Sequence, residues 1–141
     1  MKLLIFILLF SSSLHAAENT TLQQAIDGSH RSAAHKSRDQ YRHPLQTLNF
    51  FEVTANMQVL EIWPGGKAWY TEILAPYLKD NGVLYAAHFS ANSKSPYFTK
   101  NLQKFKLKIA EQPEIYGKIQ LTTLQPPEFL EIAADESVDR V

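Results

Sequence analysis

The 141-residue sequence contains no cysteine, which excludes disulfide bonds and metal centres built on thiolates. Its stability must therefore come from a hydrophobic core, for which the 45% hydrophobic content is sufficient. Neither sign of charge is in excess, because 14 Lys and Arg are balanced by 14 Asp and Glu. This balance gives no indication of a nucleic-acid partner or of binding to an anionic membrane surface.

A long hydrophobic run is also lacking. The longest, Leu3 to Phe10, is far shorter than the roughly 20 residues that a helix needs to cross a bilayer. Lys2 precedes this run, and the small residues Ala16 and Ala17 follow it. The pattern is typical of a secretory signal peptide over residues 1–17. We therefore expect an exported protein, periplasmic or secreted, and the missing cysteine leaves it without a lipid or other stable membrane anchor.

The clearest structural pattern is a strand–helix–strand unit in the middle of the chain. Residues 59–63 form an apolar run interrupted by one acid, which predicts a strand buried on both faces. The turn Pro64-Gly65-Gly66 ends that strand, and helical spacing of apolar residues follows over 69–78. The sequence Asp80-Asn81-Gly82 stops the helix, and residues 83–89 form a second apolar strand. This βαβ pattern predicts parallel strands and an α/β fold.

The rest of the chain adds helices and strands on both sides of this unit. Three helical pieces are expected before it: one capped by Thr20 or Thr21 and ended by Gly28, one over about 29–41, and one from Pro44 to Phe51. After it we expect a helix that starts at Ser95-Pro96, with its apolar stripe at Phe98, Leu102, Phe105 and Ile109. A third strand over 118–124, a short helix over 128–133 and the start of a fourth strand over 137–141 complete the prediction.

The turn after the first strand is the candidate binding site. Glu61 stands at the end of that strand, and Gly65 and Gly66 lead into a helix whose N-terminus presents free N–H groups. This arrangement is typical of a nucleotide-type site, although a glycine turn that merely packs remains the alternative. A Walker A phosphate loop is excluded, because Gly66-Lys67 is followed by Ala68 rather than by serine or threonine.

The stretch E-I-W-P-G-G…W-Y-T-E-I-L-A-P-Y-L resembles motif I of the class I S-adenosylmethionine-dependent methyltransferases. With R-S-A-A-H-K-S-R-D-Q-Y-R-H-P upstream and Y-A-A-H-F-S-A-N-S downstream, it is more closely similar to a bacterial branch of predicted methyltransferases that carry a signal peptide. The resemblance implies a Rossmann-like methyltransferase fold and S-adenosylmethionine as cofactor. It also implies the cofactor-binding residues Glu61, Trp63, Gly65, Gly66, Trp69 and His88. In the family's acid-x-Gly-x-Gly-x-Gly pattern, the corresponding residues here are Glu61, Trp63, Gly65 and Lys67.

The helices that precede the first strand in this family cover the cofactor cleft. The resemblance therefore makes Tyr41, Arg42 and His43, together with Arg38, candidates for contacts with the substrate or with the cofactor carboxylate. A solvated polar surface is the alternative for the same positions. For the neighbouring residues Arg31, His35 and Lys36, the solvated surface is our expectation.

Two further expectations concern ligands. His30 and His35 are five residues apart, which does not bring two imidazoles onto one helix face, so no metal site is predicted. Related folds place an acid after the second strand to hold the ribose hydroxyls, but no acid occurs here between Asp80 and Glu111. His88, Ser90 or Asn92 would have to make those hydrogen bonds instead.

The resemblance ends with the start of a fourth strand. We therefore expect residues 18–141 to be the N-terminal part of a methyltransferase-like Rossmann domain, with the first three to four parallel strands of an incomplete fold. Two functions follow. One is an exported S-adenosylmethionine-dependent methyltransferase, and the other is a non-catalytic periplasmic protein that binds a small ligand with a degenerate methyltransferase fold.

The predicted leader gives the first test. Export should remove it, so the intact mass of material recovered from outside the cytoplasm should correspond to a chain that begins near Ala17 or Glu18. Exported protein that still carries Met1 would contradict the signal-peptide assignment.

Overall fold

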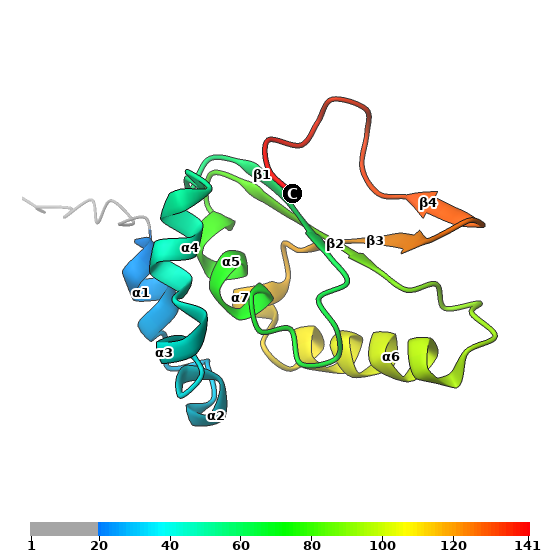
Figure 1. Ribbon diagram of the computed structural model, residues 1–141, viewed down its shortest axis with the longest axis horizontal. Helices are drawn as coiled ribbons and strands as arrows, with labels where there is room; N and C mark the ends of the chain where they lie inside the picture. The colour runs from blue at the N-terminus through cyan, green and yellow to red at the C-terminus, as the bar shows by residue number, and fades with distance from the viewer. Residues whose placement is uncertain (1–19) are drawn as a thin grey trace, which may run out of the picture.

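The computed structural model describes residues 20–141, so the predicted signal peptide lies outside the described residues. The described chain is an α/β domain with one four-stranded sheet in the order β1–β2–β3–β4 (Figure 1). β1, β2 and β3 are parallel, and β4 is antiparallel to β3. This mostly parallel sheet with helices confirms the predicted α/β class and is compatible with a Rossmann-like fold.

The central βαβ unit is confirmed. It consists of β1 (Gln58–Ile62), α5 (Thr71–Leu78) and β2 (Val83–His88). Its boundaries differ slightly from the prediction. Trp63 and Ala68 have φ angles of 50° and 53°, and these left-handed conformations interrupt regular structure, so β1 ends at Ile62 and α5 begins only at Thr71.

The second crossover runs through α6 (Pro96–Glu111) and α7 (Pro113–Tyr116) to β3 (Gln120–Gln125). The predicted apolar stripe of α6 is confirmed, because Leu102 and Phe105 are buried beneath the helix. Proline occupies the first position of α6 as expected, but the side chain of Ser95 makes no capping hydrogen bond. The short α7 was not predicted.

The end of the chain differs from the prediction. Residues 129–131 form β4 (Phe129–Glu131), so the predicted short helix over 128–133 is wrong. The turn at Pro126-Pro127 returns the chain alongside β3, where the free edge of that strand supplies backbone partners for β4. Arg140 forms a single parallel bridge with Val59, so the predicted fourth strand lies beside β1 but is limited to one bridge.

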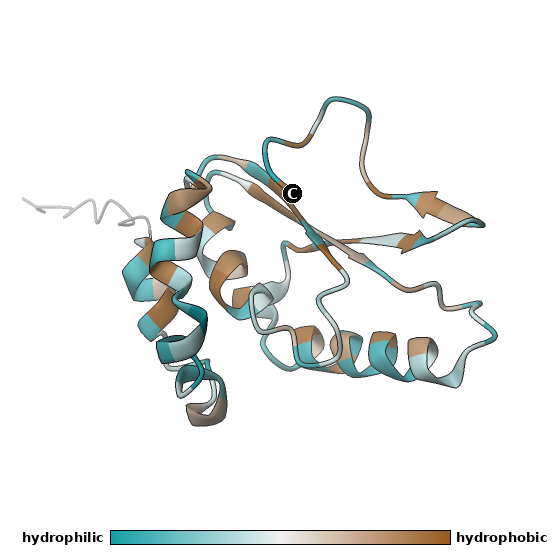
Figure 2. Ribbon diagram, in the orientation of Figure 1, coloured by the Kyte–Doolittle hydropathy of each residue, from teal (hydrophilic) through white to brown (hydrophobic). Residues whose placement is uncertain are grey.

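The helices cover one face of the sheet. Successive strand residues point to opposite faces, and Val59 and Leu84 face a core made with α1, α4, α5 and α7. Ala86 faces Phe105 of α6. Figure 2 shows the hydrophobic sides of these helices turned toward the sheet. Three residues of the opposite face, Leu60, Ala87 and Leu124, pack with Ile132 and Val138 from the segment after β3.

Four short helices precede β1: α1 (Leu22–Asp27), α2 (Ala33–Lys36), α3 (Asp39–Arg42) and α4 (Pro44–Phe50). Thr21 caps α1 through a capping box with Gln24, as predicted. The predicted single helix over 29–41 is wrong, because the chain breaks between α2 and α3. The break allows Asp39 to accept two hydrogen bonds of 2.8 Å from the guanidinium of Arg31, a residue that is only 3% exposed.

A buried carboxylate ties these helices to the rest of the domain. Glu72 of α5 is 1% exposed, and its carboxylate contacts His35 Nδ1 at 2.7 Å, Lys108 Nζ at 2.5 Å and Arg31 Nε at 3.7 Å. The solvated surface expected for Arg31 and His35 is therefore wrong. Lys36 does not contact Glu72. Its ammonium group donates to the carbonyl of Asp27 in an exposed hydrogen bond.

The backbone of Glu72 is held as well. Pro76 lies inside α5 and has no N–H to donate to the carbonyl four residues earlier, which is that of Glu72. His30 Nε2 lies 2.7 Å from this carbonyl oxygen and, as its donor, replaces the missing helical hydrogen bond. The N-terminal helices thus satisfy both the main chain and the side chain of Glu72.

No helix among residues 20–141 is long and apolar enough to cross a membrane.

We expect Glu72→Gln to lower the free energy of unfolding by about 3 kcal/mol, because it leaves buried cationic groups without their counter-charge. The N-terminal helices should loosen first, so urea denaturation should be combined with hydrogen exchange of α2 and α3. Glu111→Gln is the matched control, because Glu111 is exposed and its replacement should change stability by no more than about 0.5 kcal/mol. Equal urea midpoints for both variants would show that Glu72 has no structural role.

Candidate functional site

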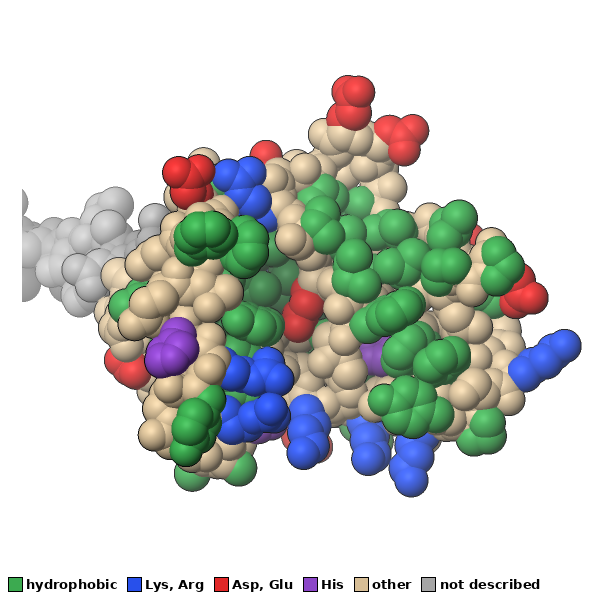
Figure 3. All heavy atoms as spheres, in the orientation of Figure 1, with side chains coloured by type: hydrophobic (Ala, Val, Ile, Leu, Met, Phe, Trp, Pro, Cys, Tyr) green, Lys and Arg blue, Asp and Glu red, His purple; other side chains and the backbone are tan. Residues whose placement is uncertain are grey.

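A hollow of about 340 Å³ opens at the carboxyl end of β1, where the chain turns toward α5. We call it the Glu61 cleft. The residues that define it are Arg38, Arg42, Glu61, Trp63, Lys67, Trp69 and Tyr70. Figure 3 shows an acidic side chain near the centre of this face, with Lys and Arg side chains gathered below it and hydrophobic side chains above and beside it. The cleft thus brings together one carboxyl group, three cationic groups and three aromatic rings.

Glu61 is held by the first turn of α5. The hydroxyl of Thr71 donates to its carboxylate at 2.6 Å. Burial raises the pKa of Glu61 to about 7, and the hydrogen bonds with Thr71 oppose this rise only in part. At neutral pH the group is therefore close to half protonated, so a cationic ligand nearby would shift it toward the charged form.

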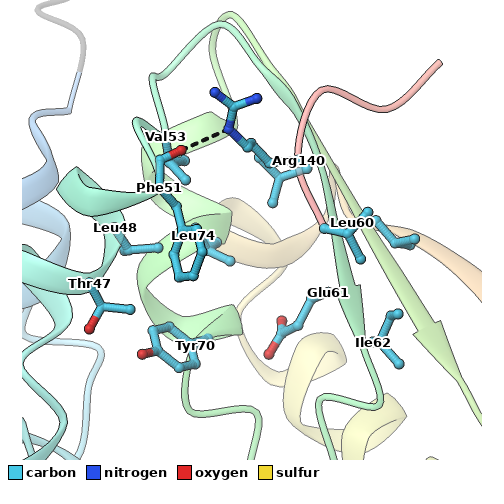
Figure 4. Close-up of a pocket in the computed structure, with 12 residues that line it drawn as sticks. Thr47, Leu48, Phe51, Val53, Leu60, Glu61, Ile62, Tyr70, Leu74 and Arg140 are labelled. Carbon is cyan, nitrogen blue, oxygen red and sulfur yellow. Dashed lines mark hydrogen bonds between the residues drawn. The ribbon is translucent and has the colours of Figure 1, made fainter. Parts of the chain in front are cut away.

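A second, apolar pocket of about 270 Å³ lies on the other side of Glu61. It is enclosed by α4, α5, β1 and the end of the chain, and Figure 4 shows Leu48 and Leu74 on the helix side with Leu60 and Ile62 on the strand side. Arg140 Nε closes the top by donating to the carbonyl of Phe51 at 2.7 Å. Glu61, Ile62 and Tyr70 line both hollows, so the carboxyl group stands between an apolar and a cationic compartment.

Trp63 lies across the carboxyl ends of three strands. Trp63 directly follows β1, and its ring centre lies 5.5 Å from that of Phe89, which follows β2. Its indole N–H donates to the carbonyl of Leu124 in β3 at 2.7 Å. The residue is still 49% exposed. Its side chain therefore forms a partly exposed cover over the sheet ends.

The two glycines of the turn have different surroundings. Gly65 has a φ of 69°, and a Cβ added there would meet no atom within 4 Å. Gly66 faces α6: its N–H donates to Asn101 Oδ1 at 3.3 Å, and an added Cβ would lie 2.9 Å from Lys104 Cβ. Gly66 thus fits the packing interpretation, whereas Gly65 leaves its backbone open to an approaching ligand.

His88 is not brought into the cleft, because it is completely buried. The N–H of Phe89 donates to its Nδ1 at 2.8 Å, and Nε2 has no hydrogen-bond partner. Burial lowers the pKa of His88 to about 4, opposed by the Gly65 backbone and assisted by Lys106, so the ring is neutral at physiological pH. Of the other two candidates for ribose contacts, Ser90 is also buried and Asn92 is exposed.

The three substrate candidates separate in the structure. The guanidinium of Arg42 lies 4.8 Å from the ring centre of Trp69 and lines the cleft. Tyr41 is 76% exposed, and His43 occupies the left-handed position between α3 and α4 with its side chain in solvent. Trp69 lines the cleft but is only 5% exposed, and its indole N–H donates to the carbonyl of His35.

Sequence reasoning missed Lys67, Tyr70 and Thr71 as parts of the site. Lys67 was considered only in a phosphate loop and at a glycine position of the methyltransferase motif. Nothing in the spacing of Glu61 and Thr71 shows that they form a hydrogen bond. The position of Thr71 in the first turn of the helix after the glycines is the only signal that could have suggested it.

No group of three or more His, Asp or Glu side chains that could hold a metal ion occurs among residues 20–141. No protein-family model, no curated protein and no solved structure matches this chain.

Glu61 should make stability depend on pH. Its pKa is raised in the folded state from 4.5 to about 7, so folding favours the protonated group. The stabilisation from this group is complete below pH 4.5, is lost as the pH rises to 7, and remains absent above. We expect the unfolding free energy of wild type to fall relative to that of Glu61→Gln by about 2 kcal/mol across this window, after a discount for partial exposure.

Urea denaturation of both proteins from pH 4 to pH 8 measures this difference. The comparison cancels the contribution of His88, which titrates in both proteins. A constant difference across the range would show that Glu61 keeps its ordinary pKa.

Proposed function

We propose that the Glu61 cleft binds S-adenosylmethionine and that the chain is an exported, methyltransferase-like protein with the corresponding Rossmann-like fold. The observation that carries this proposal is the meeting of Glu61 with Arg38, Arg42 and Lys67 in one aromatic-walled hollow at the carboxyl end of β1. Ligands of open α/β sheets bind outside the carboxyl ends of the strands, which is where this hollow lies.

The charges of the cleft suit the methionine part of the cofactor. An α-ammonium group can donate to the Glu61 carboxylate, and an α-carboxylate can pair with Arg42 or Lys67. A sulfonium is attracted to aromatic faces, which Trp63 and Tyr70 supply. Because the ammonium favours ionised Glu61, affinity should increase as the pH rises through 7.

The nucleoside part has a less complete set of partners. Gly65 offers an open backbone, but the indole of Trp63 covers the strand ends. A nucleoside that is to lie over β2 and β3 therefore requires Trp63 to release the carbonyl of Leu124. Trp63 is half-exposed, and this movement breaks one hydrogen bond and the packing of its ring against Phe89.

Bound S-adenosylmethionine would supply an activated methyl group. Transfer forms a bond from this carbon to a nucleophilic atom of the acceptor, while the sulfur keeps the electrons of the broken bond and the acceptor loses a proton. The protein contributes chiefly alignment. The apolar pocket on the other side of Glu61 is the compartment in which this alignment could occur.

A non-catalytic exported protein that binds a small zwitterion is the second candidate. The position of Trp63 favours it, because the closed cover leaves room for an amino-acid-like ligand without a nucleoside. The predicted export favours it too, since S-adenosylmethionine is made in the cytoplasm.

Calorimetric titrations with S-adenosylmethionine, methionine and adenosine distinguish the two candidates. We expect S-adenosylmethionine to bind at least about tenfold more tightly than methionine, because the nucleoside adds buried area. Intrinsic fluorescence gives a second readout, because both tryptophans of the chain line the cleft. Methionine binding as tight as that of S-adenosylmethionine would support the zwitterion-binding protein, and no binding of either ligand would overturn both.

Gly65→Asn is the sharpest variant for this test. Asparagine tolerates a positive φ, so the turn should remain folded, while the new side chain enters the open space that the ligand is expected to use. We expect an affinity loss of at least about tenfold with little change in melting temperature. Tyr41→Phe is the control, because Tyr41 is 76% exposed and is not among the residues that line the cleft. An unchanged affinity in folded Gly65→Asn would exclude this turn from the site.

A further inference from the structure

A third hollow, of about 550 Å³, lies on the helical side of the glycine turn. We call it the basic hollow. It is enclosed by α2, the turn at Gly66-Lys67 and the second half of α6. The charged and titratable side chains that line it are His35, Arg38, Lys67, Lys104, Lys108 and Glu111. Cationic groups therefore converge on one concavity from three segments that are far apart in the sequence.

Some of the cationic side chains in this hollow already have an acidic partner, and others have none. Lys108 and His35 are engaged by the buried carboxylate of Glu72. Arg38, Lys67 and Lys104 make no side-chain hydrogen bond or ion pair with any residue in the range 20–141. Glu111 is the one acid that lines the hollow, and it lies at the last residue of α6. Three cations are thus available to a ligand against one exposed acid.

The hollow is shaped by packing that does not involve these charged ends. The stem of Lys104 lies against Gly66, where an added Cβ would come within 2.9 Å of Lys104 Cβ. This contact places the stem of Lys104 beside the turn. Concave surfaces of one charge sign concentrate field lines and raise the local concentration of counter-ions.

We propose that the basic hollow is an oxyanion site that binds the phosphate group of a small molecule. A phosphate monoester carries a charge of about −1.5 to −2 at pH 7. This charge balances the three unpaired cations better than the single charge of a carboxylate does. Arg38 and Lys67 line both this hollow and the Glu61 cleft. One ligand can therefore extend from the cleft with its phosphate group in the basic hollow.

This site does not depend on S-adenosylmethionine. It is tested with inorganic pyrophosphate alone, by calorimetric titration of the full chain at low ionic strength. We expect saturable binding of one pyrophosphate per chain, and affinity that falls as salt is added. Lys67→Gln and Lys104→Gln should each weaken binding about tenfold, the usual effect of losing one hydrogen bond to a charged group.

Lys106→Gln is the matched control. Like Lys104→Gln, it removes one positive charge from α6, but Lys106 lines a different hollow. It should change the affinity by less than about twofold, since screening weakens distant charges. Melting temperatures of all three variants verify that they remain folded. An equal loss of affinity in Lys106→Gln would show that pyrophosphate responds only to net charge, and would overturn the proposal.

Three other results would also overturn it. These are no saturable binding at millimolar pyrophosphate, citrate binding as tight as pyrophosphate binding, and a short DNA duplex that binds more tightly than pyrophosphate. The last result would assign the surface to nucleic acid instead. None of these outcomes affects the test of the Glu61 cleft, since S-adenosylmethionine is absent from the titration.

Discussion

The architecture depends on one buried ion, the carboxylate of Glu72. A charged group removed from water is costly unless it is paired and hydrogen-bonded, and here Arg31, His35 and Lys108 surround it. The same residue provides a backbone carbonyl that Pro76 leaves without a helical donor, and His30 occupies that position. Because the partners come from the N-terminal helices and from α6, neither part can move away from α5 without leaving Glu72 unsatisfied.

This constraint also forms the cationic wall of the site. With Arg31 and His35 fixed, the chain turns so that α3 lies over Trp69, whose ring has the guanidinium of Arg31 at 5.2 Å and that of Arg42 at 4.8 Å. Arg38 comes to the rim between the Glu61 cleft and the basic hollow. The buried carboxylate of Glu72 therefore helps to position cationic side chains that line both hollows.

The sequence predicted those features that depend on local patterns. The apolar runs of β1 and β2, the stripe of α6 and the cap at Thr21 each depend on neighbouring residues, and each is confirmed. β4 was missed because its three residues gain strand structure only from the edge of β3. Arg31 and His35 were taken for surface residues because burial of a charge depends on a partner about 40 residues away. The difference between Gly66, which packs against α6, and Gly65, which is open, likewise depends on where α6 lies.

Two of the five non-glycine residues with a positive φ among residues 20–141 lie in the turn between β1 and α5. Trp63 and Ala68 adopt left-handed conformations without being glycine, at a cost of about 1–3 kcal/mol each. Beside them, Glu61 is partly buried, and its pKa is raised to about 7. A turn that only joined a strand to a helix would need none of these. Left-handed residues other than glycine and a carboxyl group with a raised pKa, placed where two hollows meet, make this turn the first place to test for a ligand.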